Sequence, residues 1–139
     1  MSYWYQQAIA TNSDKVAAEV RNANAAFKQA RIDWYKEKVE ESDNPKTKRV
    51  WQDEVDRINS GKDVYGEFIE RKINGVTLFT TETNRLPDEY QDLYHSLTEY
   101  SENVVEFCVI GEEGETEYYH GNFNWVGLPA AIPVILIKD

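Results

Sequence analysis

The chain has 139 residues, of which 41% are hydrophobic, and carries a formal net charge of −10. A chain of this length is expected to form one domain over residues 1–139 and to bury roughly two-thirds of its unfolded surface without a metal or a disulfide. Its single cysteine, Cys108, excludes an intrachain disulfide and a multi-cysteine zinc site, which favours a cytoplasmic location. We expect no contact with a membrane, because the sequence has neither a signal peptide nor an apolar run of the roughly 20 residues that cross a bilayer.

The N-terminal half predicts a helical hairpin. It follows an aromatic lead-in over residues 3–9, which we expect to pack back on the domain. From residue 14 to about residue 42, apolar residues recur at alternating spacings of four and three, which predicts one long helix. This apolar stripe consists of Val16, Val20, Ala23, Phe27, Ala30 and Trp34. Asp43-Asn44-Pro45 ends the helix and starts a second one over about residues 45–59, because Pro suits the first helical turn and Asp or Asn the cap. So short a break predicts an antiparallel pair, with the stripe of the first helix against the second.

The second half predicts strands and one further helix. Asn74-Gly75 is a strong signal for a hairpin turn, because both central residues of that turn need a positive φ. Strands are predicted at about residues 65–73, 76–81, 104–110, 115–120 and 133–138, with a short helix as the alternative for residues 64–73. Leu86-Pro87-Asp88 opens a helix that runs to about residue 100 with its apolar residues on one side. We therefore expect an α+β fold, with a long N-terminal helical hairpin plus one further helix packed on a small, mainly antiparallel sheet.

The sequence shows no catalytic or metal-binding motif. It contains no Gly-x-Ser-x-Gly, no phosphate-binding glycine loop, no His-Glu-x-x-His and no dinucleotide fingerprint. We expect His95 and His120 to be surface or hydrogen-bonded groups, and Cys108 to be a half-buried thiol on the same strand face as Glu106. The glutamates of residues 112–117 lack the ligand pattern of a calcium loop. We therefore expect no enzymatic activity, no metal and no cofactor.

The negative charge is concentrated in the second half of the chain. Residues 1–72 hold 13 basic and 13 acidic residues, whereas residues 73–139 hold 2 basic and 12 acidic ones. A surface that serves only solubility usually mixes signs, so a one-sided surplus indicates a surface for a positively charged partner. The candidate partner-binding carboxylates are Asp88, Glu89, Asp92, Glu99 and Glu102. Tyr90 and Tyr94 are candidate aromatic anchors of this surface if their side chains are exposed.

This pattern leads to the hypothesis of a non-catalytic acidic binding protein. Its partner would be a basic, nucleic-acid-handling protein that it blocks, in the manner of phage-encoded anti-defence inhibitors or nuclease immunity proteins. Carboxylate rows resemble nucleic-acid phosphates in charge, so nucleic-acid mimicry is one form of this hypothesis. The same charge disfavours direct binding to nucleic acid.

Two other classes of function stay open. The first is a small-molecule-binding or enzymatic α+β domain with a pocket between sheet and helices, formed with His120, Tyr118 or Trp125. The second is an oligomeric structural or assembly protein, a homodimer through the first helix, because the spacing of the apolar stripe also suits a coiled coil. The protein of the leading hypothesis would be a monomer or such a homodimer.

Overall fold

The structure is a computed structural model that describes residues 3–123 and 133–137. Its α-helices are α1 (Asp14–Glu41), α2 (Pro45–Asn59) and α3 (Asp88–Leu97). Its strands are β1 (Tyr5–Thr11), β2 (Ile69–Ile73), β3 (Val76–Thr83), β4 (Val105–Gly111) and β5 (Thr116–His120). A short 3₁₀ helix, η2 (Val134–Ile137), follows near the C-terminus. The strands form a sheet in the order β2-β3-β1-β4-β5, in which every described pair is antiparallel, so the predicted α+β class is confirmed.

The central strand of the sheet is β1, for which the sequence predicts only an aromatic lead-in. The segment does pack on the domain, but as a strand that the sequence analysis did not predict, because Tyr5–Thr11 pairs along its whole length with both β3 and β4. Ile9 lies between Phe79 and Phe107 of the two neighbouring strands. A central strand is buried on both faces, so it does not show the apolar and polar alternation by which a half-buried strand is recognised.

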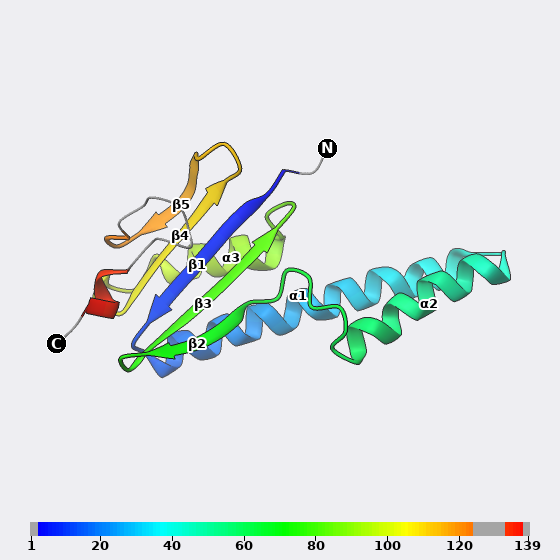
Figure 1. The fold of residues 1–139 in the computed structure, drawn as a ribbon, viewed down its shortest axis with the longest axis horizontal. Helices are drawn as coiled ribbons and strands as arrows, with labels where there is room; N and C mark the ends of the chain where they lie inside the picture. The colour runs from blue at the N-terminus through cyan, green and yellow to red at the C-terminus, as the bar shows by residue number, and fades with distance from the viewer. Residues whose placement is uncertain (1–2, 124–132, 138–139) are drawn as a thin grey trace.

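One face of the sheet is covered by α3 and by the N-terminal half of α1 (Figure 1). The core between these layers is formed by buried side chains from both helices and from β1, β3 and β4, among them Val16, Val20, Phe27, Ile9, Phe79, Leu93, Leu97, Phe107 and Val109. α3 is thereby fixed on the sheet along one side, and its other side faces outward.

The C-terminal half of α1 and the whole of α2 extend beyond the sheet as an arm (Figure 1). This arm has its own small cluster, formed by Ile32 of α1 with Val55 and Ile58 of α2. The prediction that the whole apolar stripe faces α2 is wrong, because its first part, to Phe27, is buried against the sheet and α3. Trp34 at the end of the stripe remains 49% exposed. A homodimer seam along the stripe therefore has little apolar surface available to it.

The other face of the sheet is covered in part by the C-terminal segment. Its apolar cluster contains Ala8, Ala10, Val76, Leu78, Cys108, Phe123, Ile135 and Leu136. Glu106 is buried in this layer, where its Oε1 accepts a hydrogen bond from the backbone N of Asn122 at 2.7 Å and its Oε2 one from the backbone N of Ile135 at 2.8 Å. This carboxylate therefore ties η2 to β4. Cys108 shares the face of Glu106, as expected, but is fully buried, whereas the sequence predicts a half-buried thiol.

Two predicted strands differ from the structure. The strand expected over residues 65–73 begins only at Ile69. Gly66 has φ +74° and lies so close to Phe27 that a Cβ would stand 2.5 Å from its ring, so the chain turns here before it enters the sheet. The strand expected over residues 133–138 is the 3₁₀ helix η2 at residues 134–137, and residue 138 lies outside the described residues.

Candidate functional site

The outward side of α3 and the connection that follows it carry the predicted carboxylates. Asp88 and Asp92 are exposed one helical turn apart, and Glu99 and Glu102 are exposed beyond the end of the helix. Glu89 is partly buried. We refer to these five residues as the acidic face.

Ion pairs of the described residues lie elsewhere in the molecule. They join bases and acids of α1, α2 and the residues that lead into the sheet: Arg21 with Glu70, Arg31 with Asp63 and Glu54, Arg57 with Glu54, and Lys38 with Glu41. Within residues 3–123 and 133–137, none of the five carboxylates of the acidic face belongs to an ion pair. No ion pair among the described residues therefore offsets the charges of the acidic face.

Tyr90 and Tyr94 do not belong to this surface, because both side chains are fully buried. The Tyr90 hydroxyl donates to the backbone O of Gly66 at 2.6 Å, and its ring packs 5.0 Å from that of Phe27. The Tyr94 hydroxyl donates to Oε1 of Gln7 in β1 at 2.7 Å. Burial raises the pKa of both phenols. These tyrosines seat α3 on the sheet, so neither can be an anchor for a partner.

Side chains of α1 lie along the edge of the acidic face. The carboxylate of Glu19 accepts hydrogen bonds from Oγ of Ser96 at 3.1 Å and from the hydroxyl of Tyr100 at 2.5 Å, and this second bond raises the pKa of Tyr100. Nζ of Lys15 lies 5.9 Å from the centre of the Tyr100 ring. Glu19 thus places one further carboxylate beside the acidic face. Lys15 lies at the same place and forms no ion pair among the described residues.

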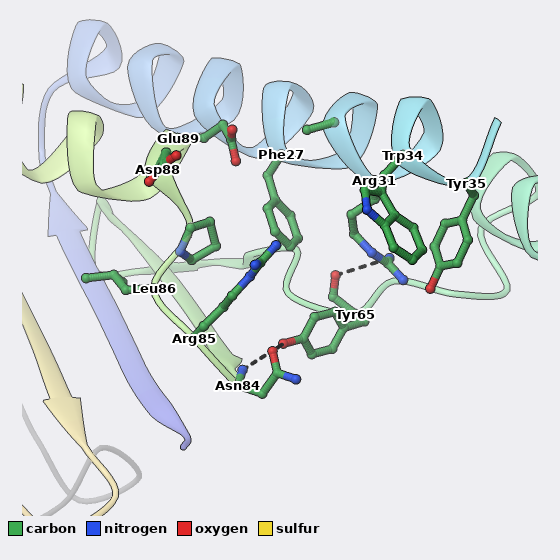
Figure 2. Close-up of a pocket in the computed structure, with 12 residues that line it drawn as sticks. Phe27, Arg31, Trp34, Tyr35, Tyr65, Asn84, Arg85, Leu86, Asp88 and Glu89 are labelled. Atoms are coloured by element: carbon green, nitrogen blue, oxygen red, sulfur yellow. Dashed lines mark hydrogen bonds between the residues drawn. The ribbon is translucent and has the colours of Figure 1, made fainter. Parts of the chain in front are cut away.

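A cleft of about 690 Å³ lies at the N-terminal end of α3 (Figure 2). One wall comes from the middle of α1, with Phe27, Ala30, Arg31, Trp34 and Tyr35. The other comes from Tyr65 and from the β3–α3 connection and the start of α3, residues 84–89. The sequence analysis missed this site, although the adjacent aromatic residues Trp34 and Tyr35 were a signal that α2 could not cover both. The cleft adjoins the acidic face, because Asp88 and Glu89 belong to both.

Arg31 is a structural residue of the cleft wall. Its Nη2 and Nη1 atoms donate to Oδ2 and Oδ1 of Asp63 at 2.9 and 3.2 Å, and Nη1 also donates to the backbone O of Tyr65 at 3.4 Å. Its guanidinium lies 5.2 Å from the centre of the Tyr65 ring. The hydrogen bond from Arg31 holds the pKa of Asp63 well below its usual range. The positive charge of Arg31 is therefore already compensated inside the protein.

Arg85 is the uncompensated base of the cleft. Figure 2 shows its side chain reaching from the β3–α3 connection towards Phe27. It has no ion pair or hydrogen bond within the described residues. The uncompensated charges of the cleft are thus one base, Arg85, and two carboxylates, Asp88 and Glu89.

The remaining residues of chemical interest do not gather at one site. Nε2 of His120 lies 2.9 Å from the backbone O of Tyr100, and Nε2 of His95 lies 3.4 Å from the Tyr118 hydroxyl. Burial, with the nearby Glu106 carboxylate, raises the pKa of the Cys108 thiol. Neither His120 nor Tyr118, which were predicted to form a ligand pocket, lines the cleft, and the third predicted residue, Trp125, lies outside the described residues. Among the residues that the structure describes, no group of three or more His, Cys, Asp or Glu could hold a metal ion.

No described helix is long and apolar enough to cross a membrane. Comparison of the chain with protein families, with curated protein sequences and with solved structures found no match.

Proposed function

We propose that this protein is a non-catalytic binding protein that captures a basic partner protein through its acidic face. The observation that carries this proposal is the contrast between two groups of charges. Four bases of α1 and α2 pair with acids of these helices, of β2 and of the connection before it, whereas the five carboxylates of the acidic face make no ion pair in the described part of the chain.

Part of the acidic face has an explanation within the helix. Asp88 and Glu89 lie in the first turn of α3, where negative charge is stabilised by the helix dipole and by the free backbone N–H groups. That argument does not extend to Asp92, Glu99 and Glu102, which lie in the middle of the helix or beyond its end. Uncompensated like charges are unfavourable for the folded chain, so these three support a role in binding positive charge from outside.

The proposed partner is a protein whose basic surface normally handles nucleic acid. Such surfaces are built to bind phosphates, and the carboxylates of the acidic face offer them charge of the same sign. Binding would then block the partner, which is the mode of action of anti-defence inhibitors and of nuclease immunity proteins. Association would be fast at low salt, because electrostatic attraction steers the two molecules together.

The test exchanges charge on the acidic face without touching the core. The variant Asp92→Lys/Glu99→Lys/Glu102→Lys is expected to fold normally and to lose a partner that the wild-type protein captures from host lysate. The matched control is Glu37→Lys/Glu40→Lys/Asp53→Lys, which makes the same change in net charge at three exposed positions of the arm. Capture that survives the first triple substitution, or that is lost equally in both, would refute the proposal. With the purified partner, raising the salt from about 20 to about 150 mM should slow association at least several-fold.

A further inference from the structure

The cleft beside α3 offers aromatic surface that the protein's own core does not use. The Trp34 indole is held edge-to-face against Tyr35, with ring centres 4.9 Å apart, and against Trp51 of α2 at 5.9 Å. It nevertheless remains 49% exposed. A large aromatic side chain that is fixed in position and half open to solvent is typical of the anchor points of binding sites.

Cations already lie against aromatic rings of the arm and of the cleft wall. The Arg31 guanidinium lies 5.2 Å from the centre of the Tyr65 ring, and Nζ of Lys38 lies 5.0 Å from the Trp34 ring. Ring faces attract cations through their negative quadrupole. Aromatic rings of the cleft wall therefore already bind basic side chains within the protein.

The charges at the end of the cleft favour the same kind of occupant. Arg31 is compensated by Asp63, which leaves Asp88 and Glu89 against the single base Arg85. The acidic face continues from these two carboxylates along α3, so the potential becomes more negative in that direction. Arginine fits this arrangement better than lysine, because its flat guanidinium can bind a carboxylate through two N–H groups at once.

We propose that the cleft binds an arginine of the partner protein, with its guanidinium at Asp88 and Glu89 and the main chain that carries it packed against Trp34. This inference rests on the proposed function and deepens it: the arginine would be an anchor residue of the basic partner, held at the N-terminal end of the acidic face. The cleft would then select partners that carry an arginine at the matching place, whereas the carboxylates along α3 would respond to positive charge of any kind.

The test uses a minimal probe, the peptide acetyl-Gly-Arg-Gly-amide, titrated into the full chain while NMR follows the tryptophan indole N–H signals. A single side chain should bind with a Kd of about 1–10 mM. The citrulline peptide, which has the same shape without the charge, should bind at least about three-fold more weakly. Trp34→Ala and Asp88→Asn/Glu89→Gln should each weaken binding about two- to five-fold, whereas Ile69→Ala, a control at an exposed apolar position on β2, should leave it unchanged.

Arg85 decides the sign of the charge that the cleft prefers. Arg85→Ala removes a like charge and should tighten binding of the arginine peptide about two-fold. If the cleft instead takes a planar anion, the same substitution should weaken binding of adenosine monophosphate, and that nucleotide should bind more tightly than the peptide. Tighter binding of the nucleotide, equal binding of the citrulline peptide, or weaker peptide binding in Arg85→Ala would each overturn the inference.

The outcomes separate this inference from the proposed function. If the peptide does not bind while the triple substitution on the acidic face still abolishes partner capture, the arginine site is refuted and the proposed function stands. If the peptide binds as expected but the triple substitution leaves capture unchanged, the arginine site is supported and the role of the acidic face is refuted.

Discussion

Replacing Glu106 by alanine is expected to destabilise the protein strongly, because this carboxylate joins the C-terminal segment to the sheet. The side chain is 1% exposed and accepts hydrogen bonds from the backbone N–H groups of Asn122 and Ile135. A hydrogen bond to a charged group contributes about 1.5–3 kcal/mol, and alanine leaves both donors without this acceptor. The gain from no longer burying a charge offsets part of the loss, so we expect a net cost of about 3–4 kcal/mol.

The expected size of the effect makes it measurable by calorimetry. For a chain of this length, each kcal/mol corresponds to a shift in Tm of about 3–5 °C, so Glu106→Ala should lower Tm by about 9–20 °C. Glu106→Gln should lie between this variant and the wild type, because its amide keeps one acceptor but turns an NH₂ group towards a second donor. Glu117→Gln, at an exposed position of the neighbouring strand, is the matched control and should change Tm by less than about 2 °C.

The thiol of Cys108 gives a second, local readout of the same contact. Cys108 is fully buried in the cluster that contains Ile135 and Leu136. If Glu106 holds this segment in place, Glu106→Ala should make Cys108 react with a thiol reagent at least about ten-fold faster under native conditions, since local opening becomes more frequent. A Tm within about 2 °C of the wild type together with unchanged Cys108 labelling would show that apolar packing alone holds the segment.

Two further predictions concern buried and partly buried polar contacts of the helical layer. Tyr94→Phe should lower the free energy of unfolding by about 1–2 kcal/mol, because Oε1 of Gln7 loses a buried donor. Urea titration should show a clear difference from the control Tyr118→Phe, whose hydroxyl is exposed. Equal free energies of unfolding for the two variants would contradict a stabilising role of the Tyr94–Gln7 hydrogen bond. The Arg31–Asp63 contact lowers the pKa of Asp63, so its contribution to stability is complete above the unfolded pKa of about 4 and is lost as the pH falls below it. Asp63→Asn should therefore flatten the acid limb of a plot of stability against pH. In the wild type, Glu54 opposes part of this slope, because its hydrogen bond with Asp63 raises the pKa of Glu54. An unchanged acid limb in Asp63→Asn would refute the contribution of the Arg31–Asp63 contact to stability.

The elements that could be predicted from the sequence are those whose determinants are local. α2 begins at Pro45 because Oδ1 of Asn44 accepts a hydrogen bond from the backbone N of Lys46 at 2.8 Å. Asn44 and Pro45 are residue types that predict a helix start from the sequence alone. The turn at Asn74-Gly75 has positive φ at both positions, as its residue types require. The exposure of Asp88 and Asp92 likewise follows from helical periodicity, since the apolar residues of α3 lie on the opposite side.

The features that escaped prediction depend on partners far away in the sequence. Gln7 is buried in the central strand because Thr83 accepts a hydrogen bond from its amide and Tyr94 donates one to it, and neither partner is visible from the local pattern of β1. The burial of Tyr90 depends in the same way on the carbonyl of Gly66. The cleft could not be predicted either, because it exists only where Trp34 of α1 faces a connection some fifty residues later in the chain.

The separation of the arm's small cluster from the main core gives the molecule two levels of local stability. Only Ile32, Val55 and Ile58 are fully enclosed in the arm, whereas the layer beneath the sheet encloses many more side chains. The outer turns of α1 and α2 can therefore open and close while the sheet stays intact. Trp34 stands on the arm and the carboxylates of α3 on the layer over the sheet, so opening of the arm would separate the aromatic end of the cleft from its acidic end.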